Sequence, residues 1–142
     1  MTKLTPFHVA VPVHDLDKAA HFYGEILGCK KGRSSNQWID WDLFGHQFVT
    51  HLNEDMLIIN HHTNAVDGHA VPVPHYGVVL QMQDWEILAK RVENAGVPFV
   101  IEPYIRFKGE AGEQATMFFL DPSGNALEFK AFKDIEKQLF AI

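Results

Sequence analysis

Strand-like and helix-like patterns of apolar residues follow one another twice along this chain. An apolar run at residues 7–13 is followed by apolar residues three and four positions apart, as far as Gly28. The same succession starts again at residues 75–83 and lasts until Gly96. A glycine directly after helical periodicity is typical of a helix that ends in a left-handed residue. The pattern predicts a strand followed by a helix in each half of the chain.

Two further landmarks repeat with the same order. Asp15 and Asp84 stand where each helix would begin, and both are predicted N-caps. The segments 42–45 and 121–124 are rich in turn-forming residues and each predicts a turn between two strands. The turns lie further apart than the aspartates, so the second copy carries extra residues. We assign these to Tyr104–Gln114, a predicted long functional loop and a candidate lid for the site.

The fold class predicted is α+β, with two tandem βαβββ modules in a single domain. Each copy is read as strand, helix, strand, strand, strand, and the middle segment as a connector with a short strand at Met56–Asn60. The predicted boundaries are module one at about 5–53, the connector at 54–73, module two at about 74–132 and a C-terminal tail at 133–142.

Three polar residues are predicted on the strand faces that point away from the helices. Side chains alternate along a strand, and the valines of the first strand form the helix-side face, which leaves His8 and Ala10 on the other. The same alternation leaves His75 and Gly77, and Glu128 in the last strand, opposite the helices, where the small Ala10 and Gly77 would leave room for a ligand. His8 and His75 occupy equivalent positions of the repeat, so a pseudo-twofold axis would bring them together. Two imidazoles and a carboxylate form a facial metal triad with open coordination positions.

Composition and charge limit the classes of partner that this chain is expected to bind. The net charge is −6 and no basic run is present, which argues against nucleic-acid binding. No apolar run reaches membrane-spanning length and the N-terminus lacks a signal-peptide pattern, so no membrane association is expected. The single cysteine, Cys29, agrees with a reducing cytoplasm. Histidines of the connector, His61, His62 and His69, are predicted to be solvated.

Four segments of the chain carry a resemblance to a known family: Phe7–Val13, Ala20-His21-Phe22-Tyr23, His75-Tyr76-Gly77-Val78 and Phe118–Lys130. In these segments the chain resembles the vicinal oxygen chelate superfamily, which contains glyoxalases, bleomycin-resistance proteins and extradiol dioxygenases. The resemblance implies a cup-shaped mixed sheet with helices on the outside, a divalent metal at its floor and a homodimer. Carried over by position, the metal ligands are His8, His75 and Glu128.

One departure from the glyoxalase pattern bears on the chemistry. Many glyoxalase-like members take a fourth protein ligand from the last strand of the first module, and alignment of the two turns places Val49 at that position. Valine cannot ligate, which favours a three-ligand site like that of extradiol dioxygenases. A bulge or a shift of register would change this assignment, because Gln47 and His51 share the face of Val49.

The predicted function is a metal-dependent, dioxygenase-type oxidation of a small substrate that chelates the metal through vicinal oxygens. Iron(II) or manganese(II) would suit dioxygen chemistry, whereas zinc or nickel would suit the alternative, a glyoxalase-type lyase or isomerase. A third reading is a ligand-binding protein like those of bleomycin resistance.

Four further side chains are candidates for the reaction. His51 is the candidate acid–base group, and Gln47 would hydrogen-bond substrate or a metal-bound water. Tyr104 and Arg106, in the predicted loop, would stack on the substrate or pair with its carboxylate. Trp38 and Trp41 are predicted on opposite faces of one strand.

Overall fold

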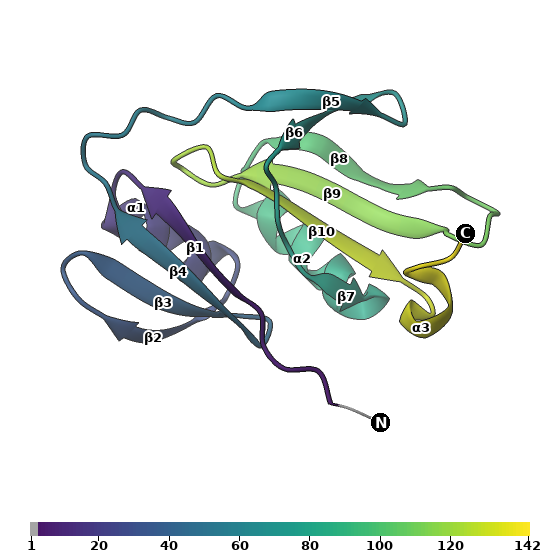
Figure 1. Cartoon of the computed structure of the whole chain (residues 1–142), viewed down its shortest axis with the longest axis horizontal. Helices are drawn as coiled ribbons and strands as arrows, with labels where there is room; N and C mark the ends of the chain where they lie inside the picture. The colour runs from purple at the N-terminus through teal and green to yellow at the C-terminus, as the bar shows by residue number, and fades with distance from the viewer. Residues whose placement is uncertain (1–2) are drawn as a thin grey trace. The chain divides into compact units, whose positions relative to one another are not determined.

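The computed structural model describes residues 3–142, which divide into two compact units. Unit 1 runs to Ile59 and also contains Asp121–Gly124, whereas unit 2 comprises Asn60–Leu120 and Asn125–Ile142. Each unit contains a four-stranded sheet with a helical segment packed against it (Figure 1). Among residues 3–142, no helix has both the length and the apolar character needed to cross a bilayer.

Unit 1 follows the predicted strand–helix–strand–strand–strand order. Its sheet has the order β1-β4-β3-β2, in which β1 and β4 are parallel and the other pairs are antiparallel. Asp15 caps the helix as predicted, since its Oδ1 accepts a hydrogen bond from Lys18 N at 3.0 Å. Gly28 has φ 78° beyond the helix, as expected. The elements are β1 (His8–Val13), α1 (Leu16–Ala20), the π-helical continuation η1 (His21–Ile26), β2 (Lys30–Ser34), β3 (Trp38–Leu43) and β4 (His46–Leu52).

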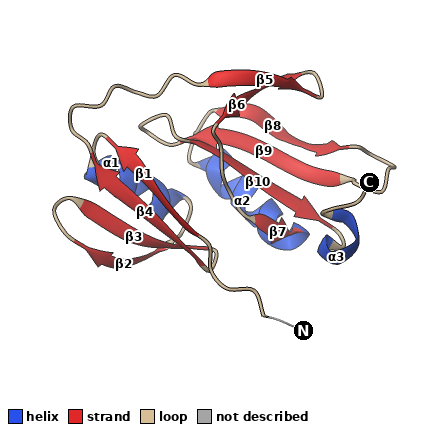
Figure 2. Ribbon diagram, in the orientation of Figure 1, coloured by secondary structure: helices blue, strands red, loops and turns tan. Residues whose placement is uncertain are grey.

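Unit 2 repeats this topology after a two-stranded hairpin. The sheet order is β7-β10-β9-β8, again with the first pair parallel and the others antiparallel. The predicted α+β duplication is therefore confirmed (Figure 2). The elements are β5 (His62–Val66), β6 (His69–Val73), β7 (Val79–Gln81), α2 (Met82–Asn94), β8 (Phe99–Arg106), β9 (Gln114–Leu120), β10 (Ala126–Phe132) and α3 (Ile135–Gln138).

The second helix begins earlier than predicted. Its N-cap is Gln81, so Asp84 lies in the first turn and is not the cap. Trp85, Leu88 and Val92 form the buried apolar face of this helix, as the periodicity predicted. An acidic side chain in the first turn still favours the helix, because it faces the free N–H groups and the positive end of the dipole.

Two loop predictions were also wrong in detail. Met56–Asn60 forms no strand; instead, the connector contains the β5–β6 hairpin, whose turn residues Asp67 and Gly68 have positive φ angles of 53° and 78°. Asp-Gly with two positive φ angles is typical of a type I′ hairpin turn. In the predicted loop Tyr104–Gln114, residues up to Arg106 extend β8, because Tyr104 pairs with Thr116 across β9.

An aromatic cluster anchors the helix of unit 1 to its sheet. Tyr23 is fully buried and its ring centroid lies 4.9 Å from that of Phe48 and 6.2 Å from that of Trp41. Trp41 donates from Nε1 to Thr50 Oγ1 at 3.1 Å. Trp38 lies on the other face, where the Arg33 guanidinium is 5.7 Å from its ring. The predicted opposite orientation of the two tryptophans is thus confirmed.

The turn Asp121–Gly124 belongs with unit 1 because buried hydrogen bonds hold it there. The Tyr23 hydroxyl donates to Asp121 Oδ2 at 2.8 Å, and Ser123 N donates to Asp121 Oδ1 at 2.9 Å. His14 N donates to Ser123 Oγ at 2.9 Å. Asp121 and Ser123 are 4% and 1% exposed. Loss of one of these donors would therefore cost a buried oxygen a hydrogen bond that water cannot readily replace.

Candidate metal centre

Two of the three predicted ligands lie in contact within unit 2. His75 precedes β7 in the chain, and the parallel segment that follows it pairs with β10, where Glu128 N donates to Tyr76 O at 2.9 Å. This pairing holds the His75 Nε2 atom 3.1 Å from Glu128 Oε1. A β-strand pair therefore fixes both side chains at one point of the sheet.

Glu128 is a buried carboxylate that stays charged. It is 6% exposed, and Thr116 Oγ1 donates to its Oε2 at 2.5 Å. Burial raises the pKa of Glu128, but the hydrogen bonds from His75 and Thr116 outweigh this and hold the pKa below its ordinary value. A charged, desolvated carboxylate is a strong ligand for a divalent cation.

The imidazole of His75 is oriented by the backbone. Its Nδ1 lies 2.7 Å from Pro72 O, a carbonyl that can only accept, so Nδ1 carries a hydrogen. This leaves the Nε2 lone pair of the neutral ring directed at Glu128, and two electron-pair donors at 3.1 Å require a proton or a metal between them. The pKa of His75 is raised, first by the hydrogen bond to Glu128 and also by the one to Pro72 O, against the effect of burial.

His8, the third predicted ligand, has the same tautomer in unit 1. It pairs with Gln47 across β1 and β4, and its Nδ1 lies 2.9 Å from Gln47 Oε1. Because the amide oxygen can only accept, Nδ1 donates and Nε2 is left with its lone pair. The His8 side chain is exposed. In metal-binding histidines, the ring nitrogen that does not bind the metal almost always donates a hydrogen bond to an acceptor of this kind.

Strand register supports the equivalence of Val49 and Glu128. His8 is paired with Gln47, two residues before Val49. The parallel bridge next to His75 gives the same offset between His75 and Glu128. Val49 is 5% exposed and has no donor atom, so the position that holds a carboxylate in the second module is apolar in the first.

The donor set fits a divalent metal. Among residues 3–142, no group of three or more histidine, cysteine, aspartate or glutamate side chains is placed so that it could hold a metal ion. Unit 2 offers one imidazole and one carboxylate, and unit 1 offers one imidazole, each with its second nitrogen or oxygen already hydrogen-bonded. Neutral Nε2 atoms and a carboxylate match the preferences of iron, manganese, zinc and nickel alike.

Gly77 has a different role from the one predicted. We expected it to leave room for a ligand, but a Cβ at this position would overlap the carbonyl oxygen of Glu128 and lie 2.6 Å from its carbonyl carbon. The space beside Gly77 is therefore filled by the backbone of β10. Glycine is required here for the close approach that brings His75 to Glu128.

The predicted acid–base residue, His51, is exposed on β4 and paired with Pro12 and Trp38. It shares the face of Gln47, as parity requires, but lies four residues further along, about 13 Å at the usual rise per residue. Gln47 contacts His8, so its position suits orientation of that ring more directly than contact with substrate.

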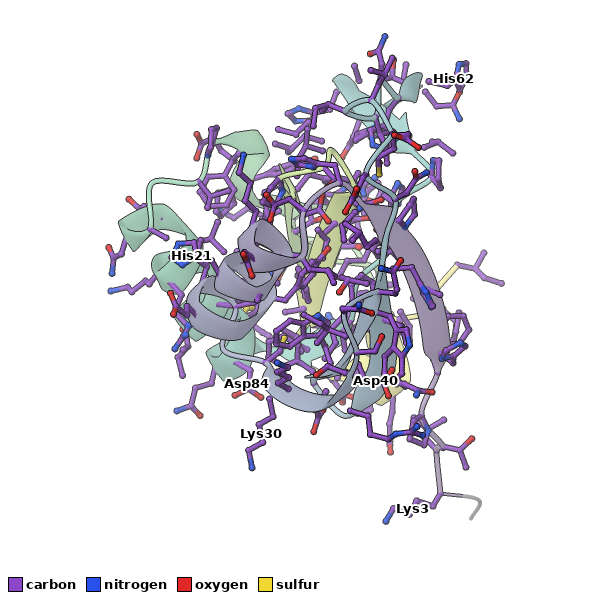
Figure 3. All side chains as sticks on the ribbon, turned by 90° about the vertical axis from the view of Figure 1, so that its left-hand side faces the viewer. Lys3, His21, Lys30, Asp40, His62 and Asp84 are labelled. Carbon is purple, nitrogen blue, oxygen red and sulfur yellow. The ribbon has the colours of Figure 1, made fainter. Side chains whose placement is uncertain are left out.

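Tyr104 and Arg106 lie on β8 in unit 2. The Tyr104 ring is 5.1 Å from that of His69, and burial raises the pKa of its hydroxyl. His69 is therefore packed rather than solvated, contrary to the prediction, whereas His62 is exposed at the edge of the hairpin (Figure 3). Arg106 is 10% exposed and its Nη1 lies 3.9 Å from Glu128 Oε2.

Sequence reasoning missed two groups that hold the site. Thr116 binds Glu128, and the Pro72 carbonyl orients His75. Thr116 lies in a predicted strand, and parity could have placed it on the face of Gln114 and Phe118. Its contact with Glu128 depends on the register of β9 against β10, which alternation alone does not specify.

A family model describes the Glyoxalase/Bleomycin resistance protein/Dioxygenase superfamily and matches residues 5–129. The crystal structure of a glyoxalase/bleomycin resistance protein/dioxygenase from Alicyclobacillus acidocaldarius is 34% identical, with a TM-score of 0.76, and the match covers 93% of this chain and 94% of that one.

Two other relatives carry more specific names. Glutathione transferase FosA of Serratia marcescens is 28% identical over 121 residues, 85% of this chain and 76% of that protein. The lactoylglutathione lyase of Agrobacterium tumefaciens is 15% identical with a TM-score of 0.64, over 100% of this chain and 98% of that one, which shows a shared fold. The chain belongs to the glyoxalase/bleomycin resistance protein/dioxygenase superfamily.

Proposed function

We propose that His8, His75 and Glu128 bind one divalent metal ion, and that the protein is a metal-dependent enzyme of the dioxygenase type. Its substrate would be a small molecule with two vicinal oxygens. The observation that carries the proposal is the His75–Glu128 pair, in which Nε2 and a charged, buried carboxylate oxygen face each other at 3.1 Å. Nothing but a proton or a cation satisfies both atoms.

The surrounding residues would orient the three metal ligands. Thr116 keeps the second carboxylate oxygen of Glu128 occupied, which directs Oε1 toward the ion. Pro72 O and Gln47 Oε1 hold His75 and His8 in the ligating tautomer. A divalent metal held by these groups would supply a positive charge for two vicinal substrate oxygens and, as iron(II) or manganese(II), a binding position for dioxygen.

The dioxygenase assignment rests on the apolar Val49. A fourth protein ligand at this position would leave two open coordination positions on a six-coordinate ion, enough for a chelating substrate alone. With three protein ligands, a third open position remains for dioxygen.

A second candidate is metal-dependent chemistry without dioxygen, as in a lyase, isomerase or group-transfer enzyme. Similarity to glutathione transferase FosA, at 28% identity, favours this candidate. The same three ligands would then hold zinc, nickel or manganese, which polarise a substrate oxygen without a change of oxidation state. The two candidates differ in metal and in oxygen consumption.

The proposal is tested on protein purified without oxygen. Elemental analysis would give the bound metal, and an oxygen electrode would follow uptake with a panel of catechols and 2-hydroxy ketones. Iron or manganese together with substrate-dependent uptake is the expected result. Zinc or nickel without uptake would favour the second candidate, and unchanged ligand binding by a metal-free His8→Ala variant would favour a binding protein.

Gln47→Leu is expected to weaken metal binding about 10- to 100-fold, the usual effect of removing the partner of a ligating histidine. The His8 ring would lose the acceptor that keeps the hydrogen on Nδ1. Gln47→Glu keeps an acceptor and should retain the affinity. Isothermal titration with Zn²⁺ measures the affinity, and ¹⁵N chemical shifts of the His8 ring report its tautomer. Equal affinities of the two variants would contradict the role of Gln47.

Metal affinity is expected to rise with pH and to level off above the pKa of His75. In the metal-free protein the hydrogen bond to Glu128 raises the pKa of His75 above its usual 6.5, and a metal must displace the proton that this bond holds. Glu128→Gln removes the charge that holds the proton, so the pKa of His75 in that variant should move down. Proton release during titration with Zn²⁺, in buffers of different ionisation enthalpy, measures both effects. Affinity independent of pH between about 6 and 8 would contradict this prediction.

A further inference from the structure

Arg106 is a nearly buried guanidinium whose hydrogen-bonding capacity is only partly used. It is 10% exposed, and its Nε has no hydrogen-bond acceptor. The nearest acidic oxygens are Asp67 Oδ2, 3.6 Å from Nε, and Glu128 Oε2, 3.9 Å from Nη1. Both distances exceed that of a hydrogen bond. An unused donor on a buried cation is costly, so a site of this kind is typical of a position that a ligand completes.

Gln114, the cross-strand neighbour of Arg106, has an unused hydrogen-bond acceptor. The two residues are paired between β8 and β9, which puts their side chains on one face of the sheet. The Gln114 Nε2 group donates to Gly112 O at 3.3 Å, but Oε1 is buried and has no donor. An unused donor and an unused acceptor therefore stand next to each other, on the face that also carries Thr116 and Glu128.

The β5–β6 hairpin brings a carboxylate to this position. Its turn places Asp67 beside Arg106, and Val71 of β6 packs against Ile101 and Phe118 on the same sheet face. The hairpin and β8 lie side by side in unit 2 (Figures 1 and 2). Asp67 is 40% exposed, so its pairing with Arg106 is partly screened by water and weak.

We propose that Arg106 and Gln114 form a subsite for an acidic group of the substrate, with Asp67 as a carboxylate that occupies the approach until substrate binds. The group would present an anionic oxygen to Arg106 and an O–H or N–H hydrogen to Gln114 Oε1, as a hydrogen phosphonate or a 2-hydroxycarboxylate does. Calling this ligand the substrate rests on the proposed function, because the subsite adjoins Glu128.

Chemistry and position both favour an anion. A planar guanidinium binds carboxylate or phosphonate oxygens through two parallel hydrogen bonds, and such charge-assisted bonds are strong where water is excluded. Asp67 cannot complete this geometry from 3.6 Å. A free anion that moves closer would displace Asp67 and release the hairpin turn. The metal would hold one part of the substrate and Arg106 the acidic part, which selects for small oxygenated acids.

The test uses metal-free full-length protein, so that its outcome does not depend on metal binding. Inorganic phosphate is titrated at pH 6, where it carries both an anionic oxygen and a hydroxyl, and amide chemical shifts are followed by NMR. Acetate, which lacks the donor hydrogen, serves as the comparison. We expect phosphate to shift the signals of Arg106, Gln114 and Asp67 and to bind more tightly than acetate.

Three variants separate the parts of the subsite. Arg106→Gln should weaken phosphate binding at least about tenfold, and Asp67→Asn should strengthen it about threefold or more, since one competing charge is removed. Gln114→Met should abolish the preference for phosphate over acetate. Matched controls on the same segment are Lys108→Gln, which removes an exposed cation, and Glu102→Gln, which removes an exposed anion.

Each outcome decides the proposal. Phosphate binding that Arg106→Gln weakens and Lys108→Gln leaves unchanged supports it, whereas equal losses in the two variants show a general charge effect and overturn it. No strengthening in Asp67→Asn, or the same strengthening in Glu102→Gln, overturns the assignment of Asp67. Arg106→Lys, which keeps the charge, serves if Arg106→Gln fails to fold, and should also bind phosphate more weakly. Loss of metal binding with the anion site intact would refute the proposed function alone.

Discussion

Glu128→Gln is expected to lower the affinity for a divalent metal at least about 100-fold, because it removes the only charged ligand of the proposed triad. Glutamine is isosteric and its amide oxygen can still accept the hydrogen bond from Thr116. The fold should therefore persist while metal binding and turnover are lost. Titration with Zn²⁺ and Mn²⁺, with circular dichroism as a check on folding, measures this effect.

The exposed pair His21 and Glu25 offers a matched control. These side chains also form a histidine–glutamate contact, at 2.5 Å, but both lie at the surface of one helical segment. Glu25→Gln should leave metal affinity unchanged, because both side chains are exposed, whereas Glu128 is buried and His75 is held by the Pro72 carbonyl. Equal affinity of the Glu128→Gln variant and the unaltered protein would remove the basis of the proposed function.

Gly77→Ala is expected to destabilise the protein by about 3 kcal/mol or more, at the upper end of single substitutions. The added methyl group would overlap the Glu128 carbonyl, so the segment after His75 and β10 must separate. The hydrogen bond from Glu128 N to Tyr76 O, at 2.9 Å, would be broken. Urea denaturation of the metal-free protein measures the loss of stability, and metal affinity should fall with it because His75 and Glu128 move apart.

Gly112→Ala is the control for this substitution. A methyl group on Gly112 would meet no atom within 4 Å beyond its neighbours in the chain, and the backbone there is outside the left-handed region. An alanine should therefore be accommodated at little cost. If the two variants unfold at the same urea concentration, the contact between the strands is not what requires glycine at position 77.

Periodicity in the sequence carried most of the fold. Apolar alternation separates Val11 and Val13, which are 5% and 1% exposed, from the exposed His8 on the other face. The repeat predicted two modules of the same order, and the two sheets have matching strand orders. Such patterns are local consequences of burial, since a strand or helix must turn its apolar face to the core wherever the chain goes.

Boundaries and connections were less predictable. The strand expected at 75–83 is reduced to an isolated bridge at Tyr76 and to β7, and helix α2 already starts at Met82. The connector contains a hairpin that the sequence pattern did not indicate. Its histidine at position 69 packs against Tyr104, which no local pattern around His69 indicates. Short segments have little periodicity of their own, and their structure depends on partners distant in the chain.

The sequence by itself determined the duplicated α+β fold, the face on which His8, His75 and Glu128 lie, and the absence of a ligating side chain at position 49. Only the tertiary structure decided which atoms meet: His75 Nε2 with Glu128 Oε1, Thr116 with the second carboxylate oxygen, and Arg106 with Asp67. The physical reason is that alternation fixes the side of a strand from the order of residues alone. Contacts between side chains depend on strand register and hairpin placement, which long-range backbone pairing sets.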